Sequence, residues 1–245
     1  MNENIFDIKD KYILVTGASS GIGKDVSKLI SEYKGKLIVT GRNDDRLNET
    51  FLMLEGNHHK KIVCDLTDEN QITNLVNSLP AVDGIIHSAG ITEYMPAKFI
   101  KSTHLEKVFN INFKAPVFLT QKLLASKKLN KNASIVFLSS AAAKHAYFGG
   151  SMYSSSKKAL ETYSSALALE LADQKIRVNC VSPAMVETEM LDKASDVVSA
   201  ESIEQFRKLH PLGFGKAGDV SSVILFLLSD AAKWITGQNI VLGGL

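Results

Sequence analysis

Short apolar runs rich in β-branched residues recur along this chain, each followed by a stretch long enough to hold a helix. The runs are YILVT at 12–16, KLIVT at 36–40, KIVC at 61–64, DGIIH at 83–87, SIVFLS at 134–139 and RVNCV at 177–181. Such runs are typical of parallel strands buried on both faces of a sheet. Helical spacing between them, with cap residues such as Asp68 and Ser102, indicates crossover helices. The pattern predicts an α/β fold: a single-domain, doubly wound parallel sheet with helices on both faces.

No internal boundary divides the chain. The sequence has 245 residues and contains no Pro-rich linker, long charge block or repeat. We therefore expect residues 1–245 to form a single domain. The least regular stretch, about 184–218, lacks a clear strand, and we expect a mobile substrate lid within it, at about 187–212.

Bulk composition excludes several classes of function. A net charge of +2 is too small to indicate nucleic-acid binding. The chain lacks both an apolar run of about 18 residues and the apolar core of a signal peptide, so we expect neither membrane spanning nor export. Cys64 and Cys180 lie in apparent strands, which predicts buried thiols rather than a disulfide or a metal site. A reducing cytoplasm fits this pattern best.

A glycine-rich turn, TGASSGIG, directly follows the first predicted strand. Gly17, Gly21 and Gly23 allow the backbone to turn sharply and to approach a ligand closely. A helix that begins near Ile22 would direct its free N–H groups at a phosphate. Glycines alone are common in structural turns, but this position between strand and helix favours a dinucleotide site.

The stretch YSSSK contains a phenol and an ammonium group four residues apart. On a helix, Tyr153 and Lys157 would share one face, one turn apart. An isolated pair of this kind is by default a surface pair. Ser140, thirteen residues earlier at the end of a predicted strand, favours catalysis instead. Reduction of a carbonyl needs an acid, and a neighbouring ammonium stabilises a phenolate, which predicts a lowered pKa for Tyr153.

Several motifs occur in the order and near the spacing of the short-chain dehydrogenase/reductase family, which the chain resembles over almost its whole length. They are TGASSGIG, CDLT at 64–67, HSAG at 87–90, NIN at 110–112, SS at 139–140, Y-x-x-x-K, NCVSPAMVET and ITGQNIVLGG. The resemblance implies a Rossmann-type fold that binds a nicotinamide dinucleotide and interconverts a carbonyl and a secondary alcohol. It also implies a homo-oligomer, commonly a tetramer.

The resemblance also implies roles for individual residues. The catalytic set would be Asn112, Ser140, Tyr153 and Lys157. Tyr153 would be the general acid and base, and Lys157 would adjust the pKa of Tyr153 and bind the ribose. Asn112 would hold a water that relays protons. The cofactor contacts would be Gly17, Ser19, Ser20, Gly21, Ile22, Gly23, Arg42, Asp65, Leu66, Ser88, Ala89, Gly90, Tyr153, Lys157, Pro183, Val186 and Thr188. The substrate contacts would be Ser140, His145 and Tyr153. His145 could instead be a loop residue without a role in binding. Phe148 and Met152 either line an apolar pocket or simply pack against neighbouring side chains.

The end of the second strand, VTGRND, bears on the choice of dinucleotide. An acidic side chain there would hold the adenosine ribose and repel a 2′-phosphate. This chain has Gly41 at that point, followed by Arg42, whose guanidinium can clamp a phosphate. NADP(H) is therefore favoured. Asp44 and Asp45 lie close by and would either favour NAD(H) or simply start the next helix.

Four positions, in three motifs, depart from the family pattern. His87 and Ser88 replace two asparagines, Ala184 replaces a usual glycine and narrows the allowed backbone, and Leu242 stands where an acid is common. None of them removes a catalytic group.

We therefore expect an NADP(H)-dependent oxidoreductase. One alternative is a non-catalytic dinucleotide sensor or scaffold, although such a protein would be free to lose the tyrosine, lysine or serine. Another is a sugar-nucleotide epimerase or dehydratase, which needs a larger carboxy-terminal region than this chain has after Val181. The resemblance allows 3-oxoacyl thioesters, steroids, sugars and small ketones as substrates.

Overall fold

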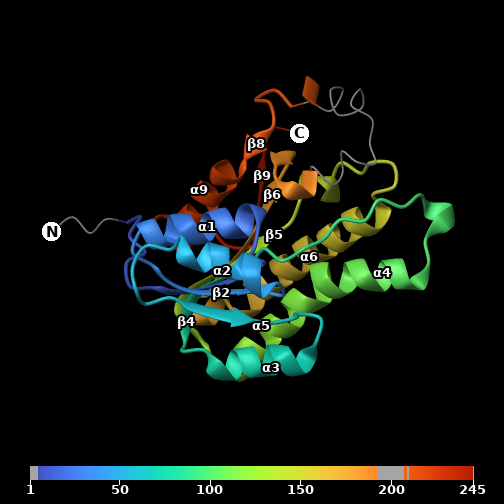
Figure 1. Cartoon of the computed structure of the whole chain (residues 1–245). Helices are drawn as coiled ribbons and strands as arrows, with labels where there is room; N and C mark the ends of the chain where they lie inside the picture. The colour runs from blue at the N-terminus through green and yellow to red at the C-terminus, as the bar shows by residue number, and fades with distance from the viewer. Residues whose placement is uncertain (1–4, 192–206, 209, 245) are drawn as a thin grey trace.

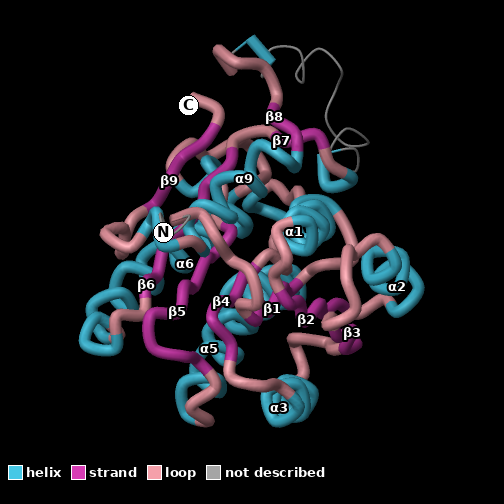
Figure 2. The backbone as a smooth tube through the Cα atoms, turned by 90° about the vertical axis from the view of Figure 1, so that its left-hand side faces the viewer, coloured by secondary structure: helices cyan, strands magenta, loops and turns pink. Residues whose placement is uncertain are grey.

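The computed structural model describes residues 5–191, 207–208 and 210–244. Its main feature is a parallel sheet of seven strands in the order β3-β2-β1-β4-β5-β6-β9 (Figures 1 and 2). The strands are β1 Tyr12–Thr16, β2 Lys36–Gly41, β3 Lys60–Val63, β4 Val82–His87, β5 Leu129–Leu138, β6 Arg177–Pro183 and β9 Asn239–Leu242. The strand order reverses direction between β1 and β4, which is where such sheets bind ligands at their carboxyl ends.

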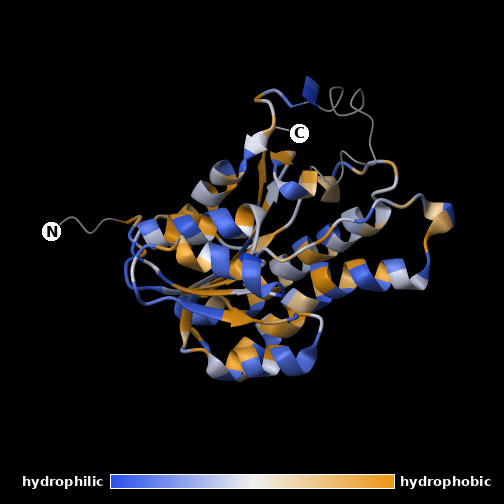
Figure 3. Cartoon of the chain, in the orientation of Figure 1, coloured by the Kyte–Doolittle hydropathy of each residue, from blue (hydrophilic) through white to orange (hydrophobic). Residues whose placement is uncertain are grey.

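Helices cover both faces of the sheet, as the sequence predicts. The helices α1 Gly21–Glu32, α2 Asp44–Leu52 and α9 Ala217–Leu228 pack on one face, and α3 Glu69–Ser78, α5 Ala115–Ala125 and α6 Ser151–Glu170 pack on the other. Alternate strand residues serve the two cores, so that Leu14 belongs to one and Ile13 and Val15 to the other. Figure 3 shows apolar residues concentrated along the strands and the helix surfaces that face them.

Two predictions about the strands are wrong. The carboxy-terminal strand β9 was not among the predicted runs, although it completes the sheet beside β6. The segment predicted to lack a strand contains two very short ones, β7 Val186–Glu187 and β8 Gly215–Lys216, which pair with each other. Of the predicted lid at 187–212, residues 192–206 and 209 lie outside the described residues.

The helical segment that begins at Ser102 is interrupted. Helix α4 Ser102–Phe109 is followed by a π-helical turn, Asn110–Lys114, before α5 begins. The wider turn brings the Asn112 side chain inward, where its Oδ1 accepts a hydrogen bond from Ile91 N (2.8 Å) and its Nδ2 donates to Ile91 O (2.9 Å). Turns of this type are frequent at functional sites. Short 3₁₀ turns also occur at Ala97–Phe99, Ala141–Ala143, Ala172–Gln174 and Asp230–Ala232.

Both cysteines, Cys64 and Cys180, are buried free thiols, as predicted. Within the described ranges, the side chains of His, Cys, Asp and Glu form no group of three that could hold a metal ion. In that same part of the chain, no helix has the length and apolar character needed to cross a membrane.

His87, one of the departures noted in the sequence, ties the end of β4 to α5. Its ring stacks on Phe137, with centroids 4.6 Å apart and planes at 8°, and its Nε2 lies 2.9 Å from Thr120 Oγ1. Burial lowers the pKa of His87 to about 3, because a charged imidazole would lose its hydration there. The native state therefore holds this residue neutral.

Acid should destabilise the protein through His87. The unfolded imidazole titrates near 6.5, so the contribution of the neutral ring is complete above that pH and is lost progressively as the pH falls toward about 3. At pH 5 the loss should be about 2 kcal/mol. Urea unfolding at pH 7.5 and at pH 5 measures the difference in the free energy of unfolding between the two pH values. This difference should become smaller in His87→Gln. It should stay at the wild-type value in His58→Gln, because His58 is exposed. Equal pH sensitivity in both variants would contradict the prediction.

Candidate active site

The glycine turn lies against the loop that follows β4. Gly17 has φ +65°, and a Cβ atom there would lie 2.7 Å from Ala89 Cα, so only glycine fits. Ser20 is the N-cap residue of α1, and no side chain from the described part of the chain caps that helix. Its first N–H groups therefore have no side-chain acceptor among the described residues, which suits a pyrophosphate.

Thr16 holds these two loops together. Its Oγ1 accepts hydrogen bonds from Ser88 N (3.1 Å) and Ala89 N (3.2 Å), and a Cβ atom at Gly23 would lie 3.1 Å from Ser88 Oγ. The structure thus brings the two predicted cofactor segments together. From the sequence, no role was assigned to Thr16. Thr16 is the last residue of the first strand and directly precedes the glycine turn, and this position could have indicated its role.

Asn112 and Lys157 flank Gly90. A Cβ atom at Gly90 would lie 3.3 Å from both Asn112 Oδ1 and Lys157 Nζ. Asn112 Nδ2 also donates to Ser156 Oγ (3.0 Å), while Lys157 Nζ donates to Leu138 O (2.7 Å). Both side chains are buried, and their polar atoms meet beside the loop predicted to touch the cofactor.

Tyr153 and Ser140 complete the group. The Tyr153 phenol shares a hydrogen bond with the Ser140 hydroxyl, and Ser140 Oγ accepts another from Ala142 N (3.2 Å). Lys157 Nζ lies 5.8 Å from the centre of the Tyr153 ring. The ends of β4 and β5, the π-turn and α6 therefore bring all four predicted catalytic residues to one end of the sheet.

Burial shifts the pKa values of Tyr153 and Lys157, and the shift of Tyr153 is opposite to the predicted one. Burial raises the pKa of Tyr153 to about 12, against a smaller lowering by the Ser140 hydrogen bond. Burial also lowers the pKa of Lys157 to about 8. The predicted lowering of the Tyr153 pKa by the ammonium is wrong, because loss of hydration outweighs the other effects on both groups. The phenol consequently keeps its proton throughout the neutral range.

The end of β2 lies close to the glycine turn. A Cβ atom at Gly41 would lie 3.3 Å from Ser19 Oγ, so an acidic side chain at this position would crowd Ser19. Arg42 is exposed and has no salt bridge with any described residue. Asp44 instead pairs with Lys61 (2.6 Å) in the first turn of α2.

The segment after β6 reaches back over the glycine turn. A Cβ atom at Gly21 would lie 3.6 Å from Thr188 Cγ2, so Thr188 lies beside the glycine turn. Glu189 pairs through both carboxylate oxygens with Arg46 Nη2, at 2.5 and 2.6 Å. Pro183 ends β6 in a buried position, and Val186, partly buried, begins β7.

The Ala184 departure is accommodated by a glycine elsewhere. Ala184 N donates to Leu242 O (2.9 Å), and a Cβ atom at Gly243 would lie 2.7 Å from Ala184 Cβ. Gly243 has φ +95°, which glycine adopts without strain. The extra methyl group of Ala184 therefore has room.

Four other predicted residues differ in their exposure and contacts. His145 is exposed in the loop after β5, Phe148 is 75% exposed, and Met152 is only 2% exposed and so belongs to the core. Asp65 turns its Oδ1 back onto Thr67, accepting from the Thr67 N (2.9 Å) and Oγ1 (2.7 Å).

Tyr147 was missed by sequence reasoning. It lies near enough to Tyr153 to raise that residue's pKa, and its hydroxyl is 3.3 Å from Thr92 Oγ1. Its ring packs against Gly150, where a Cβ atom would collide with it. In the sequence, Tyr147 and Phe148 are followed directly by Gly149 and Gly150, and this pattern could have drawn attention to Tyr147.

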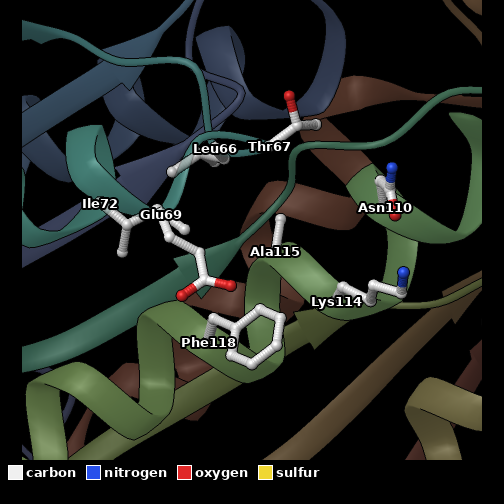
Figure 4. Close-up of a pocket in the computed structure, with 8 residues that line it drawn as sticks. All are labelled: Leu66, Thr67, Glu69, Ile72, Asn110, Lys114, Ala115 and Phe118. Carbon is white, nitrogen blue, oxygen red and sulfur yellow. The ribbon is translucent and has the colours of Figure 1, made fainter.

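A separate pocket of about 310 Å³ lies between α3 and the π-turn (Figure 4). Its lining residues are Leu66, Thr67, Glu69, Ile72, Asn110, Lys114, Ala115 and Phe118. It contains none of the four catalytic candidates, and it adjoins the predicted cofactor site only through Leu66.

The chain is similar to known proteins along nearly its whole length. A family profile described as "Enoyl-(Acyl carrier protein) reductase" matches residues 17–244. The chain is 31% identical over 241 residues to a 3-oxoacyl-[acyl-carrier-protein] reductase of Rickettsia felis, with 98% of each protein covered. It is 31% identical over 244 residues to an NAD-dependent glycerol dehydrogenase of Listeria innocua, covering 98% of this chain and 94% of that protein.

Among solved structures, a short-chain dehydrogenase/reductase of Brucella melitensis, described as a glucose/ribitol dehydrogenase, is similar with a TM-score of 0.89. It is 28% identical, and the match covers 98% of this chain and 97% of that one. These similarities extend through both the glycine turn and the helix that carries the Tyr153 pair.

Proposed function

Because this chain belongs to the short-chain dehydrogenase/reductase family and is thus an NAD(P)-dependent oxidoreductase, we propose that it interconverts a carbonyl and a secondary alcohol with NADP(H). One observation carries the proposal: Asn112, Ser140, Tyr153 and Lys157 meet at the sheet end that also holds the glycine turn. A non-catalytic sensor would have no need of this complete group.

The described residues fit a nicotinamide dinucleotide, since the glycine turn permits close approach and α1 presents free N–H groups. When bound, the nicotinamide supplies or accepts the hydride. In reduction, Tyr153 donates its phenolic proton to the carbonyl oxygen, and in oxidation it takes the proton back. Ser140 holds the same oxygen through its hydroxyl, and Lys157 binds the ribose.

Asn112 would hold the water that relays protons to Lys157. Its two amide hydrogens bond to Ile91 O and Ser156 Oγ, and one lone pair of its Oδ1 accepts from Ile91 N. The second lone pair of Oδ1 is the group left for a water beside Gly90.

We favour NADP(H) over NAD(H) for the cofactor. Ser19 would crowd an acidic side chain at position 41, Arg42 has no described ionic partner, and Asp44 is engaged with Lys61. A 2′-phosphate would place its charge near the Arg42 guanidinium. The glycerol dehydrogenase relative is named as NAD-dependent, so relatives of equal similarity do not decide the matter.

Arg42→Ala should selectively weaken NADPH binding. Loss of a charge-assisted hydrogen bond to a phosphate should lower NADPH affinity about 10- to 100-fold and leave NADH affinity within about threefold. Titration calorimetry with both cofactors measures this. Arg46→Ala is the matched control, because Glu189 already engages that arginine. Equal losses for NADPH and NADH in Arg42→Ala would contradict the assignment.

The substrate we propose to test first is a 3-oxoacyl thioester, on the strength of the named reductases among the relatives. NADPH oxidation against a panel that also includes steroids, sugars and small ketones would identify the class. Turnover with none of these carbonyl compounds would contradict the proposed reaction.

We also propose a homotetramer located in the cytoplasm. Trp234 is 96% exposed, Leu169 81% and Val241 40%, and β9, which carries Val241, is a sheet edge. Large exposed apolar side chains and an open strand edge are typical of subunit interfaces. The buried, unpaired thiols of Cys64 and Cys180 support a reducing compartment.

A further inference from the structure

Glu161, which has no part in the mechanism above, is a buried acid one turn beyond Lys157 on α6. The residue is only 8% exposed. Its Oε1 accepts hydrogen bonds from Ser139 Oγ (3.1 Å), Ser182 Oγ (3.1 Å) and Asn239 Nδ2 (2.8 Å). We refer to Glu161, Ser139, Ser182 and Asn239 as the Glu161 cluster.

The partners of Glu161 come from three neighbouring strand ends. Ser139 follows β5 and directly precedes Ser140, Ser182 directly precedes Pro183 at the end of β6, and Asn239 begins β9. A single carboxylate oxygen of Glu161 thus links two segments to helix α6, which carries Tyr153 and Lys157. One segment contains Ser140, and the other contains Pro183 and is expected to face the nicotinamide.

The cluster is constrained in its hydrogen bonding. Asn239 Oδ1 faces Ser182 Oγ at 2.7 Å while its Nδ2 donates to Glu161, which fixes the orientation of the amide. Ser139 Oγ lies 3.3 Å from Lys157 O as well, so the serine also contacts the backbone of the catalytic lysine. Each member therefore limits the freedom of its neighbours.

Burial of this carboxylate is costly. A buried carboxylate loses hydration worth several kcal/mol, and only good hydrogen bonds offset the loss. At Oε1, Glu161 has the amide donor of Asn239 and the hydroxyls of Ser139 and Ser182, each of which shares its single hydrogen with a second acceptor. At Oε2 it has Lys158 Nζ (3.0 Å), although that lysine side chain is 62% exposed. An apolar side chain could fill the same volume without losing hydration. The charge of Glu161 is therefore better explained by the groups that it positions than by a gain in stability.

We propose that Glu161 is a positioning residue for the reaction: it fixes Ser140 and the Pro183 segment relative to Tyr153 and Lys157. The inference rests on the proposed function. A displacement of about 1 Å between reacting groups can lower a rate about 100-fold, so a brace of this kind acts on kcat more than on binding.

Glu161→Leu removes the brace and retains a buried side chain. We expect kcat per folded protein to fall about 10- to 100-fold, with the NADPH dissociation constant within about threefold of wild type. Hydrogen exchange should become faster in residues 138–143 and 182–187. Glu161→Gln should keep kcat within about fivefold, because its amide oxygen can still accept from the three donors.

Lys158→Met is the matched control, because it removes only the exposed partner at Oε2 and should leave kcat within about twofold. If Glu161→Leu fails to fold, Ser139→Ala and Ser182→Ala each remove one donor and should lower kcat about three- to tenfold, with less than additive effects together. Wild-type kcat in Glu161→Leu, or in both serine variants, would overturn the inference.

The two proposals fail differently. Unchanged turnover in Tyr153→Phe would remove the proposed mechanism, yet faster hydrogen exchange in Glu161→Leu would still establish the structural brace. Wild-type kcat in Glu161→Leu together with an inactive Tyr153→Phe would refute the positioning role alone. A stability loss in Glu161→Leu without any change in kcat per folded protein would show a purely structural role and overturn the inference.

Discussion

Tyr153→Phe should lower kcat by about 10²- to 10⁴-fold and change the NADPH dissociation constant by less than about threefold. The substitution removes only the hydroxyl group that hydrogen-bonds Ser140, and general acid catalysis is worth about this much. Because the pKa of Tyr153 is about 12, the wild-type phenol is fully protonated at neutral pH and ready to donate. Steady-state turnover and fluorescence titration of NADPH measure the two quantities.

Tyr163→Phe provides the matched control. Tyr163 lies on the same helix, α6, but its ring packs against Phe113 and Phe137, away from Ser140. Its loss of a hydroxyl should leave kcat within about twofold. Wild-type turnover in Tyr153→Phe, or an equal loss in both variants, would show that Tyr153 is not the acid.

Lys157→Met should nearly abolish turnover and yet stabilise the protein. We expect kcat to fall by at least about 100-fold, because the ribose ligand and the charge beside Tyr153 are lost. The fall of the Lys157 pKa from 10.5 to about 8 means that holding the ammonium inside costs about 3 kcal/mol at pH 7. Methionine avoids this cost but leaves Leu138 O without its donor, so the free energy of unfolding should rise by about 1–2 kcal/mol.

The pH dependence gives a second measure of the same variant. Between pH 8 and 10.5 Lys157 binds more protons in the unfolded state than in the native state, so its own contribution to the free energy of unfolding should rise through this window, while the buried thiols of Cys64 and Cys180 act in the opposite direction above about pH 9. Lys157→Met should lack that rise, and Lys158→Met, which changes an exposed neighbour, should keep it. An inactive Lys157→Met that is clearly less stable than wild type would contradict a functional reason for burying the charge.

Much of the site was predictable because parallel strands place their carboxyl ends along one edge. Once Ser140 was assigned to the end of one strand and Gly17 to the end of another, their proximity followed from topology. The glycine turn was predictable for a local reason, since strand, turn and helix follow each other directly in the sequence.

The remaining features depend on contacts between distant residues. The π-turn at Asn112 follows from its bonds to Ile91, twenty-one positions away, which no local spacing reveals. The direction of the Tyr153 pKa shift depends on burial, which the four-residue spacing does not determine. Strand β9 was missed because its side chains are only partly buried at the sheet edge, which leaves a weak apolar signal.

The contact between Ala184 and Gly243 couples two positions nearly sixty residues apart in the sequence. One of them can carry a methyl group only while the other carries none, because both Cβ atoms would compete for the same space. The two sites should therefore covary: lineages with glycine after the Ser-Pro pair are free to hold a side chain at the carboxy-terminal turn, subject to its backbone angles. The segment that follows β6 is in this way coupled sterically to the turn that follows β9.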